Sequence, residues 1–152
     1  MKIIIDADAV PRQVLEICQQ ASVAFSVKLI TVANFNHRID SPCHLVVGDD
    51  PQAADIRVVN LANKGDIVIT QDWGLAALVL ARGAAALTPK GLVFHDDEIP
   101  FYLENRETMA KARRSGKRLR GPKKRSTADD ERFKKRLYRL LEKLAKDEGP
   151  NI

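Results

Sequence analysis

Residues 65–91 read GDIVITQDWGLAALVLARGAAALTPKG, and this stretch decides the fold class. Its segment 67–70 is short and almost continuously apolar, which is typical of a strand buried on both faces. The Ala- and Leu-rich segment 74–82 predicts a helix. Gly83 follows directly and is expected to end it. A second apolar run at 85–87 predicts another strand. A strand, a helix and a strand in this order favour a parallel sheet.

The same alternation extends to the rest of the chain. We expect further strands over 2–5, 27–32, 45–47 and 92–94, and helices over 11–21, 52–63, 100–113 and from 127 onward. Strand and helix alternate four times, so the expected fold class is α/β, a three-layer sandwich with a mainly parallel central sheet. We expect three parts: an α/β domain over 1–110, a basic linker over 111–126 and a C-terminal amphipathic helix over 127–148.

The C-terminal helix carries an apolar stripe that needs a partner. Its residues, at helical spacing, are Phe133, Leu137, Leu140, Leu141 and Leu144. Such a stripe packs either on the body of the protein or on a second copy of the chain. A homodimer through this helix is therefore one of the hypotheses.

The composition excludes several classes of protein. With 152 residues, 45% hydrophobic and 30% charged, the chain is an ordinary globular domain rather than a disordered one. It has no apolar run long enough for a transmembrane helix. The apolar run near Met1 is three residues long and ends in an acid, so we expect no signal peptide and a cytoplasmic protein. The two cysteines and three histidines lack the spacing of a disulfide framework or a zinc site.

Charge is distributed unevenly along the chain. Residues 1–103 carry 8 Lys or Arg and 12 Asp or Glu, whereas residues 104–152 carry 17 and 8. Residues 111–125 read KARRSGKRLRGPKKR, with nine basic residues and no acid. This predicts contact with a polyanion, which favours nucleic acid as the partner. The candidate contacts are Arg113, Arg114, Lys117, Arg118, Arg120, Lys123, Lys124 and Arg125.

Acidic residues follow three of the predicted strands. They are Asp6 and Asp8, Asp49 and Asp50, and Asp72, with Asp55 about one turn into the next helix. Ligands of open α/β sheets bind at the carboxyl ends of the strands, so we expect these acids to converge there. Carboxylates that lie close together repel, and a cation relieves the repulsion. Oxygen ligands alone indicate Mg²⁺ or Mn²⁺ rather than zinc or copper.

Each acid also has an ordinary structural interpretation. Asp8, Asp50 and Asp72 each precede a helix or turn and could simply cap it. Asp55 could face solvent on its helix. Asp6 is harder to explain in this way, because it ends an Ile-Ile-Ile run where an unpaired carboxylate would be costly.

Two more polar residues need a separate interpretation. Asp66 begins the strand that Asp72 follows, and six strand residues place it roughly 20 Å away. We therefore interpret Asp66 as a turn or cap residue. Asn34, at the end of a predicted strand, could bind a ligand or cap a turn, and its spacing does not decide between the two.

Four segments resemble the YaiI/YqxD-type family of small bacterial proteins. They are IIIDADAVP at 3–11, AADI at 53–56, the stretch 65–91 quoted above, and RRSGKRLRGPKKRSTADDERF at 113–133. Their order and spacing match over nearly the whole chain. The resemblance implies a fold similar to the PIN-like metal-dependent nucleases.

That resemblance also implies roles for individual residues. The metal ligands would be Asp6, Asp55 and Asp72, and Asp8 would join them in the catalytic set. Asp50, Thr70 and Asn34 are possible additional site residues; no motif decides between Asp49 and Asp50. Val10 departs from the family, whose opening motif usually has a cysteine there, so a cysteine is not required at this position.

Three further hypotheses stand beside the metal-dependent nuclease, for which RNA is the favoured substrate. The chain could bind nucleic acid without catalysis. Its Asp-x-Asp opening also resembles the haloacid-dehalogenase superfamily, in which Asp6 would be a nucleophile and Asp8 an acid or base. The last hypothesis is a structural role, in which the chain forms a homodimer through its C-terminal helix.

Overall fold

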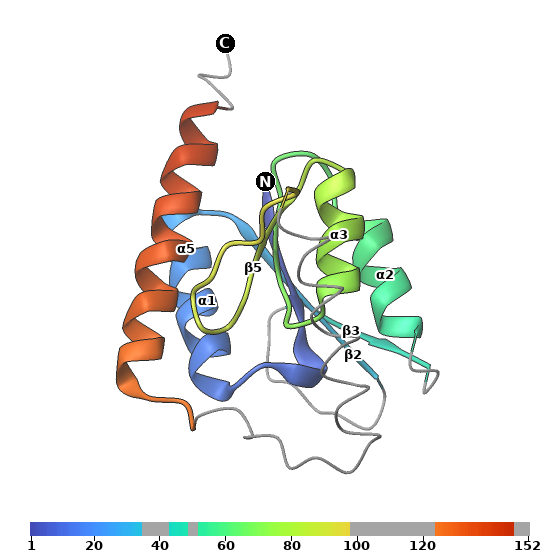
Figure 1. The fold of residues 1–152 in the computed structure, drawn as a ribbon, viewed down its shortest axis with the longest axis horizontal. Coiled ribbons are helices and arrows are strands. Elements are labelled where there is room, and N and C mark those ends of the chain that lie inside the picture. Colours follow the sequence, from blue (N-terminus) through green and yellow to red (C-terminus); the bar gives the residue numbers. More distant parts are fainter. Residues whose placement is uncertain (35–42, 49–51, 98–123, 148–152) are drawn as a thin grey trace.

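A five-stranded parallel sheet forms the centre of the protein (Figure 1). The computed structural model describes residues 1–34, 43–48, 52–97 and 124–147. The strands are β1 (Lys2–Asp6), β2 (Lys28–Asn34), β3 (His44–Val47), β4 (Ile67–Ile69) and β5 (Ala85–Leu87). Their order is β3-β2-β1-β4-β5, and all four neighbouring pairs are parallel.

Helices cover both faces of this sheet. They are α1 (Arg12–Phe25), α2 (Ala53–Leu61), α3 (Trp73–Ala81) and α5 (Thr127–Asp147), and a short 3₁₀ helix, η1 (Ala7–Ala9), directly follows β1. Figure 1 shows α1 and α5 on one side of the sheet and α2 and α3 on the other. The predicted fold class, an α/β three-layer sandwich, is therefore confirmed.

The isoleucine run of β1 shows why the sheet needs both layers. Ile3 and Ile5 belong to the core cluster that includes α1 and α5, whereas Ile4 belongs to the cluster that includes α2 and α3. All three side chains are fully buried. Successive strand residues point to opposite faces, so a continuous apolar run is what a central strand between two helical layers requires.

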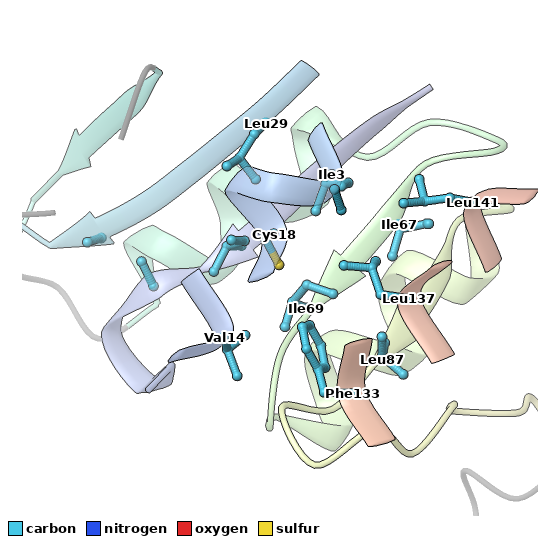
Figure 2. Close-up of a cluster of buried hydrophobic side chains, with 14 residues drawn as sticks. Ile3, Val14, Cys18, Leu29, Ile67, Ile69, Leu87, Phe133, Leu137 and Leu141 are labelled. Atoms are coloured by element: carbon cyan, nitrogen blue, oxygen red, sulfur yellow. The ribbon is translucent and has the colours of Figure 1, made fainter. Parts of the chain in front are cut away.

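The apolar stripe of α5 lies against the body of the same chain. Phe133, Leu137 and Leu141 recur every four residues and are fully buried. They belong to one cluster with residues of α1, β1, β4 and β5, and Figure 2 shows them directed at that cluster. The stripe is thus covered by the protein's own core.

Contacts at the start of α5 hold the helix to the turn after β5. Arg125 donates hydrogen bonds of 2.6 Å to the Pro89 carbonyl and to Asp130. Gly91 in that turn has a φ of 86°, and a Cβ there would lie 2.9 Å from the Arg132 backbone. Only glycine allows this close approach without displacing the helix.

Two expectations about elements were wrong in detail. Residues 92–94 form no strand, because the turn folds the chain straight back and leaves a single antiparallel bridge between Leu87 and Val93. The helix expected to end near 21 continues to Phe25, and Ser26 ends it in the left-handed conformation with a φ of 54°.

Part of the predicted organisation lies outside the described residues. The helix expected over 100–113 is one such part, as is the basic linker apart from its last three residues. In the ranges that are described, no helix is both long and apolar enough to cross a membrane.

Candidate functional site

The strand order places a topological switch point at the carboxyl ends of β1 and β4. These two strands are neighbours, but the chain leaves β1 toward α1 on one face and leaves β4 toward α3 on the other. Connections that diverge in this way open the ligand-binding crevice of an open α/β sheet. Asp6 is the last residue of β1, and Thr70 and Asp72 follow β4. The expected edge of the sheet is therefore also its topological switch point.

Asp6 is an almost buried carboxylate at this point. Its side chain is 9% exposed, and its Oδ2 accepts a 3.0 Å hydrogen bond from the hydroxyl of Thr70. The pKa of Asp6 is raised to about 6: burial is the largest cause, the Thr70 bond offsets it in part, and the charges of Asp55, Asp8 and Asp72 add to the rise. Four predicted site residues thus share one electrostatic environment.

Asp72 caps α3 and also belongs to this acidic group. Its Oδ1 accepts hydrogen bonds from the backbone amides of Gly74 at 2.9 Å and Leu75 at 3.2 Å. Its own amide donates to the Thr70 hydroxyl oxygen at 3.0 Å. The capping interpretation is confirmed for Asp72, and it does not remove the residue from the site. The cap holds the carboxylate at the helix N-terminus, where the backbone stabilises negative charge.

Asp8 connects the ends of β1 and β2. It lies in η1, and both of its carboxylate oxygens accept from the backbone amide of Asn34 at 3.2 Å. Asn34 therefore enters the site through its main chain, by positioning Asp8.

Asp55 approaches from the layer formed by α2 and α3. It lies in the first turn of α2, and its pKa is raised by burial and then by the charges of Asp72 and Asp8. Carboxylate and hydroxyl oxygens are the donor set that Mg²⁺ and Mn²⁺ accept. In the described ranges, no group of three acidic, histidine or cysteine side chains is arranged to hold a metal ion. Asp49 and Asp50 lie outside those ranges.

Asp66 lies at the opposite end of the sheet and serves the fold. Its carboxylate accepts from the amides of Lys2 at 3.0 Å and Asn63 at 2.8 Å, and it forms an ion pair with the Lys2 ammonium group. The interpretation of Asp66 as a turn or cap residue, outside the acidic site, is confirmed.

Only the end of the predicted basic segment is described. Lys124 is exposed, whereas Arg125 is half-buried by the contacts that hold α5 in place. The candidate contacts outside the described residues are Arg113, Arg114, Lys117, Arg118, Arg120 and Lys123.

Comparison with known proteins decides the family. Residues 4–143 match the model of a family described as "Uncharacterized BCR, YaiI/YqxD family". The chain belongs to the YaiI/YqxD family. A UPF0178 protein of Heliobacterium modesticaldum is 47% identical over 141 residues, covering 93% of this chain and 97% of the relative. A UPF0178 protein of Clostridium tetani is 40% identical, covering 96% of this chain and all of the relative.

The likeness of the fold to PIN-like nucleases stays a prediction, because no solved structure matches this chain. Val10, which stands where the family's opening motif usually has a cysteine, packs against the cluster of α1 and α5. In this member the position therefore contributes to packing.

Sequence reasoning missed a groove between α2 and α3. It has a volume of about 590 Å³, and both Asp55 and Asp72 line it. Most of its surface is apolar and comes from Ile56, Val59, Leu75, Ala77 and Leu78. One signal could have indicated it: α3 reads WGLAALVLA, without a charged side chain, yet it is a helix in the outer layer of the protein.

Proposed function

We propose that this protein is a divalent-metal-dependent hydrolase of phosphodiester bonds in nucleic acid, with RNA as the favoured substrate. The observation that carries the proposal is the convergence of acids at the switch point of the sheet, where the almost buried Asp6 carboxylate, held by Thr70, lies within the electrostatic reach of three other carboxylates. Burying like charges together is unfavourable unless a cation offsets it. A cluster of this kind at a topological switch point is therefore a candidate functional site.

Each residue has a distinct part in this proposal. Asp6, Asp55 and Asp72 would hold Mg²⁺ or Mn²⁺, and the Thr70 hydroxyl orients Asp6 through its 3.0 Å bond. Asp8, held by the Asn34 amide, would assist these ligands in the catalytic set. When bound, the metal would lower the pKa of a water and stabilise charge on the phosphate.

Metal binding would have to draw these carboxylates together. The described residues contain no ready-made group of three ligands, and Asp72 Oδ1 already accepts two cap bonds. Because a cation removes the repulsion that keeps the acids apart, its binding favours the closer arrangement. Asp50 remains a possible additional ligand.

The charge of the C-terminal part supports a nucleic-acid substrate. Residues 104–152 carry 17 Lys or Arg and 8 Asp or Glu. Basic side chains bind the phosphate backbone without reading its sequence, which suits a hydrolase of broad specificity.

A cleavage assay tests the proposal. End-labelled RNA and DNA oligonucleotides are incubated with the full chain in Mg²⁺, Mn²⁺ or EDTA. We expect metal-dependent cleavage that Asp72→Asn abolishes, because asparagine keeps the helix cap but loses the charge. Glu16→Gln on α1 is the control, because this exposed acid pairs only with Arg12 among the ion pairs described. Cleavage that survives in Asp72→Asn would contradict the proposal.

One observation favours a second candidate, nucleic-acid binding without catalysis. Asp8 and Asp72 already accept hydrogen bonds from backbone amides, as purely structural acids would. This candidate predicts salt-sensitive binding that is indifferent to Asp6→Asn. The phosphatase hypothesis requires a nucleophilic Asp6, and a trapped aspartyl-phosphate on that residue would support it.

A further inference from the structure

The groove between α2 and α3 opens beside the acids. Asp55 and Asp72 lie on its wall and belong to the acidic group around Asp6. A molecule whose phosphate lies at these acids could therefore extend into the groove. The volume of about 590 Å³ falls within the range of roughly 300–1,000 Å³ that is usual for small-molecule sites.

The lining selects an uncharged and largely apolar occupant. Ile56 of α2 and Leu78 of α3 are 57% and 55% exposed, although both are large apolar side chains. Among the described residues that line the groove, none is a lysine or arginine, and two are acids. Without a bound cation the two acids would repel a phosphate, and the apolar remainder of the groove offers a phosphate no positive partner, whereas the faces of a planar ring would bury the exposed apolar surface.

We propose that this groove binds the unpaired base of the nucleotide whose phosphodiester lies at the acidic group. The inference rests on the proposed function and names its substrate as single-stranded nucleic acid. A base stacked in a duplex cannot enter a groove between two helices, whereas an unpaired base can.

The groove lining also includes two amide side chains that could meet the edge of such a base. Gln52 and Asn60 also line the groove, and both belong to the α2 side. Amide groups offer hydrogen-bond donors and acceptors, which match the polar edge of a nucleobase. The arrangement, with apolar walls and a few polar groups, is that of a ligand pocket.

Methyl NMR on the full chain tests this inference without any need for turnover. Uridine 5′-monophosphate is titrated, with Mg²⁺ present, into protein with ¹³C-labelled methyl groups, and ribose 5-phosphate is the probe that lacks the base. We expect the nucleotide to shift the methyl signals of Ile56, Val59 and Leu78, and ribose 5-phosphate to leave them unchanged. Equal shifts from both probes, or none from the nucleotide at millimolar concentration, would overturn the inference.

A pair of matched variants adds a second readout. Leu78→Gln should weaken nucleotide binding about tenfold, because it replaces apolar contact by a polar side chain of similar size. Val23→Gln is the control, since Val23 is 81% exposed on α1, in the other helical layer. A nucleotide affinity that is the same in both variants would count against the groove.

Cleavage assays separate this inference from the function on which it rests. If an oligonucleotide with an abasic site at the cleavage position is cut as fast as the intact one, the base-binding groove fails while the hydrolase stands. If the nucleotide shifts the groove methyls but no metal supports cleavage, the groove stands while the hydrolase fails.

Discussion

The hydroxyl of Thr70 donates a 3.0 Å hydrogen bond to Oδ2 of Asp6, although the two residues are 64 positions apart in the chain. The bond joins the ends of β1 and β4, where Thr70 is 1% exposed and Asp6 is 9% exposed. A hydrogen bond to the charged form stabilises a carboxylate against the cost of burial. Thr70 therefore keeps the pKa of Asp6 lower than burial alone would set it.

Removing this hydroxyl should raise the pKa of Asp6. Thr70→Val keeps the shape but loses the bond to Asp6 and the bond from the Asp72 amide. Without the bond to its charged form, we expect the Asp6 pKa to rise above its value of about 6. We also expect a loss of stability of about 1–3 kcal/mol at pH 8, where the carboxylate is charged. A ¹³C NMR titration of the carboxyl carbon measures the pKa. Thr70→Ser is the control that keeps the hydroxyl, and an unchanged pKa in Thr70→Val would contradict the account.

Asp6→Asn should stabilise the protein at neutral and alkaline pH. The folded pKa of about 6 lies above the ordinary value of 3.8, so folding favours the protonated form. The contribution of this group is fully present below pH 3.8 and is lost as the pH rises through 6. From these values, the ionised carboxylate destabilises the fold by on the order of 3 kcal/mol at pH 8.

Urea unfolding between pH 3 and pH 8 measures this effect. Asp6→Asn should be more stable than the wild type at pH 8, with the difference shrinking as the pH falls toward 4. A variant that is less stable than the wild type at pH 8 would show that the buried charge is well compensated.

Gly91→Ala should destabilise the docking of α5. A Cβ at this position would lie 2.9 Å from the Arg132 backbone, and the φ of 86° disfavours any side chain. We expect a loss of roughly 2 kcal/mol or more in unfolding free energy. Gly48→Ala is the matched control, because a Cβ there meets nothing within 4 Å. Equal stability of the two variants would mean that α5 docks differently.

Asp66→Asn should affect stability without affecting metal binding. The substitution removes the charge that pairs with Lys2 and weakens the bonds from two backbone amides. We expect a loss of about 1–3 kcal/mol in unfolding free energy. Calorimetry should give the same Mn²⁺ affinity as for the wild type. A loss of affinity as large as that of Asp72→Asn would disprove the division between structural and site acids.

The central elements of the fold could be predicted because their apolar patterns are unambiguous. The runs at 3–5 and 67–69 are buried on both faces, and only a two-layered covering of helices accommodates them. The run at 92–94 looks the same in the sequence but forms a single bridge. The sequence of a short apolar run after a tight turn does not reveal whether the run pairs along the sheet as a strand or makes only one bridge to it.

The site could be predicted in part, since the ends of parallel strands share an edge. The expected convergence of Asp6, Asp55 and Asp72 followed from that rule. Asp55 and Asp72 raise the pKa of Asp6, and Asp72 raises that of Asp55, which agrees with it. The Thr70 bond to Asp6 depends on the register of two distant strands. The groove depends on how α2 packs beside α3. Neither relationship is encoded in a local pattern, which is why sequence reasoning did not find them.

The most direct test of the acidic site is Mn²⁺ binding by calorimetry to the full chain, to Asp72→Asn and to the exposed control Glu16→Gln. Circular dichroism confirms that each variant keeps the fold. The account predicts stoichiometric binding that Asp72→Asn weakens at least about tenfold and Glu16→Gln leaves unchanged. Absence of binding at millimolar Mn²⁺, or binding that Asp72→Asn does not weaken, would contradict it.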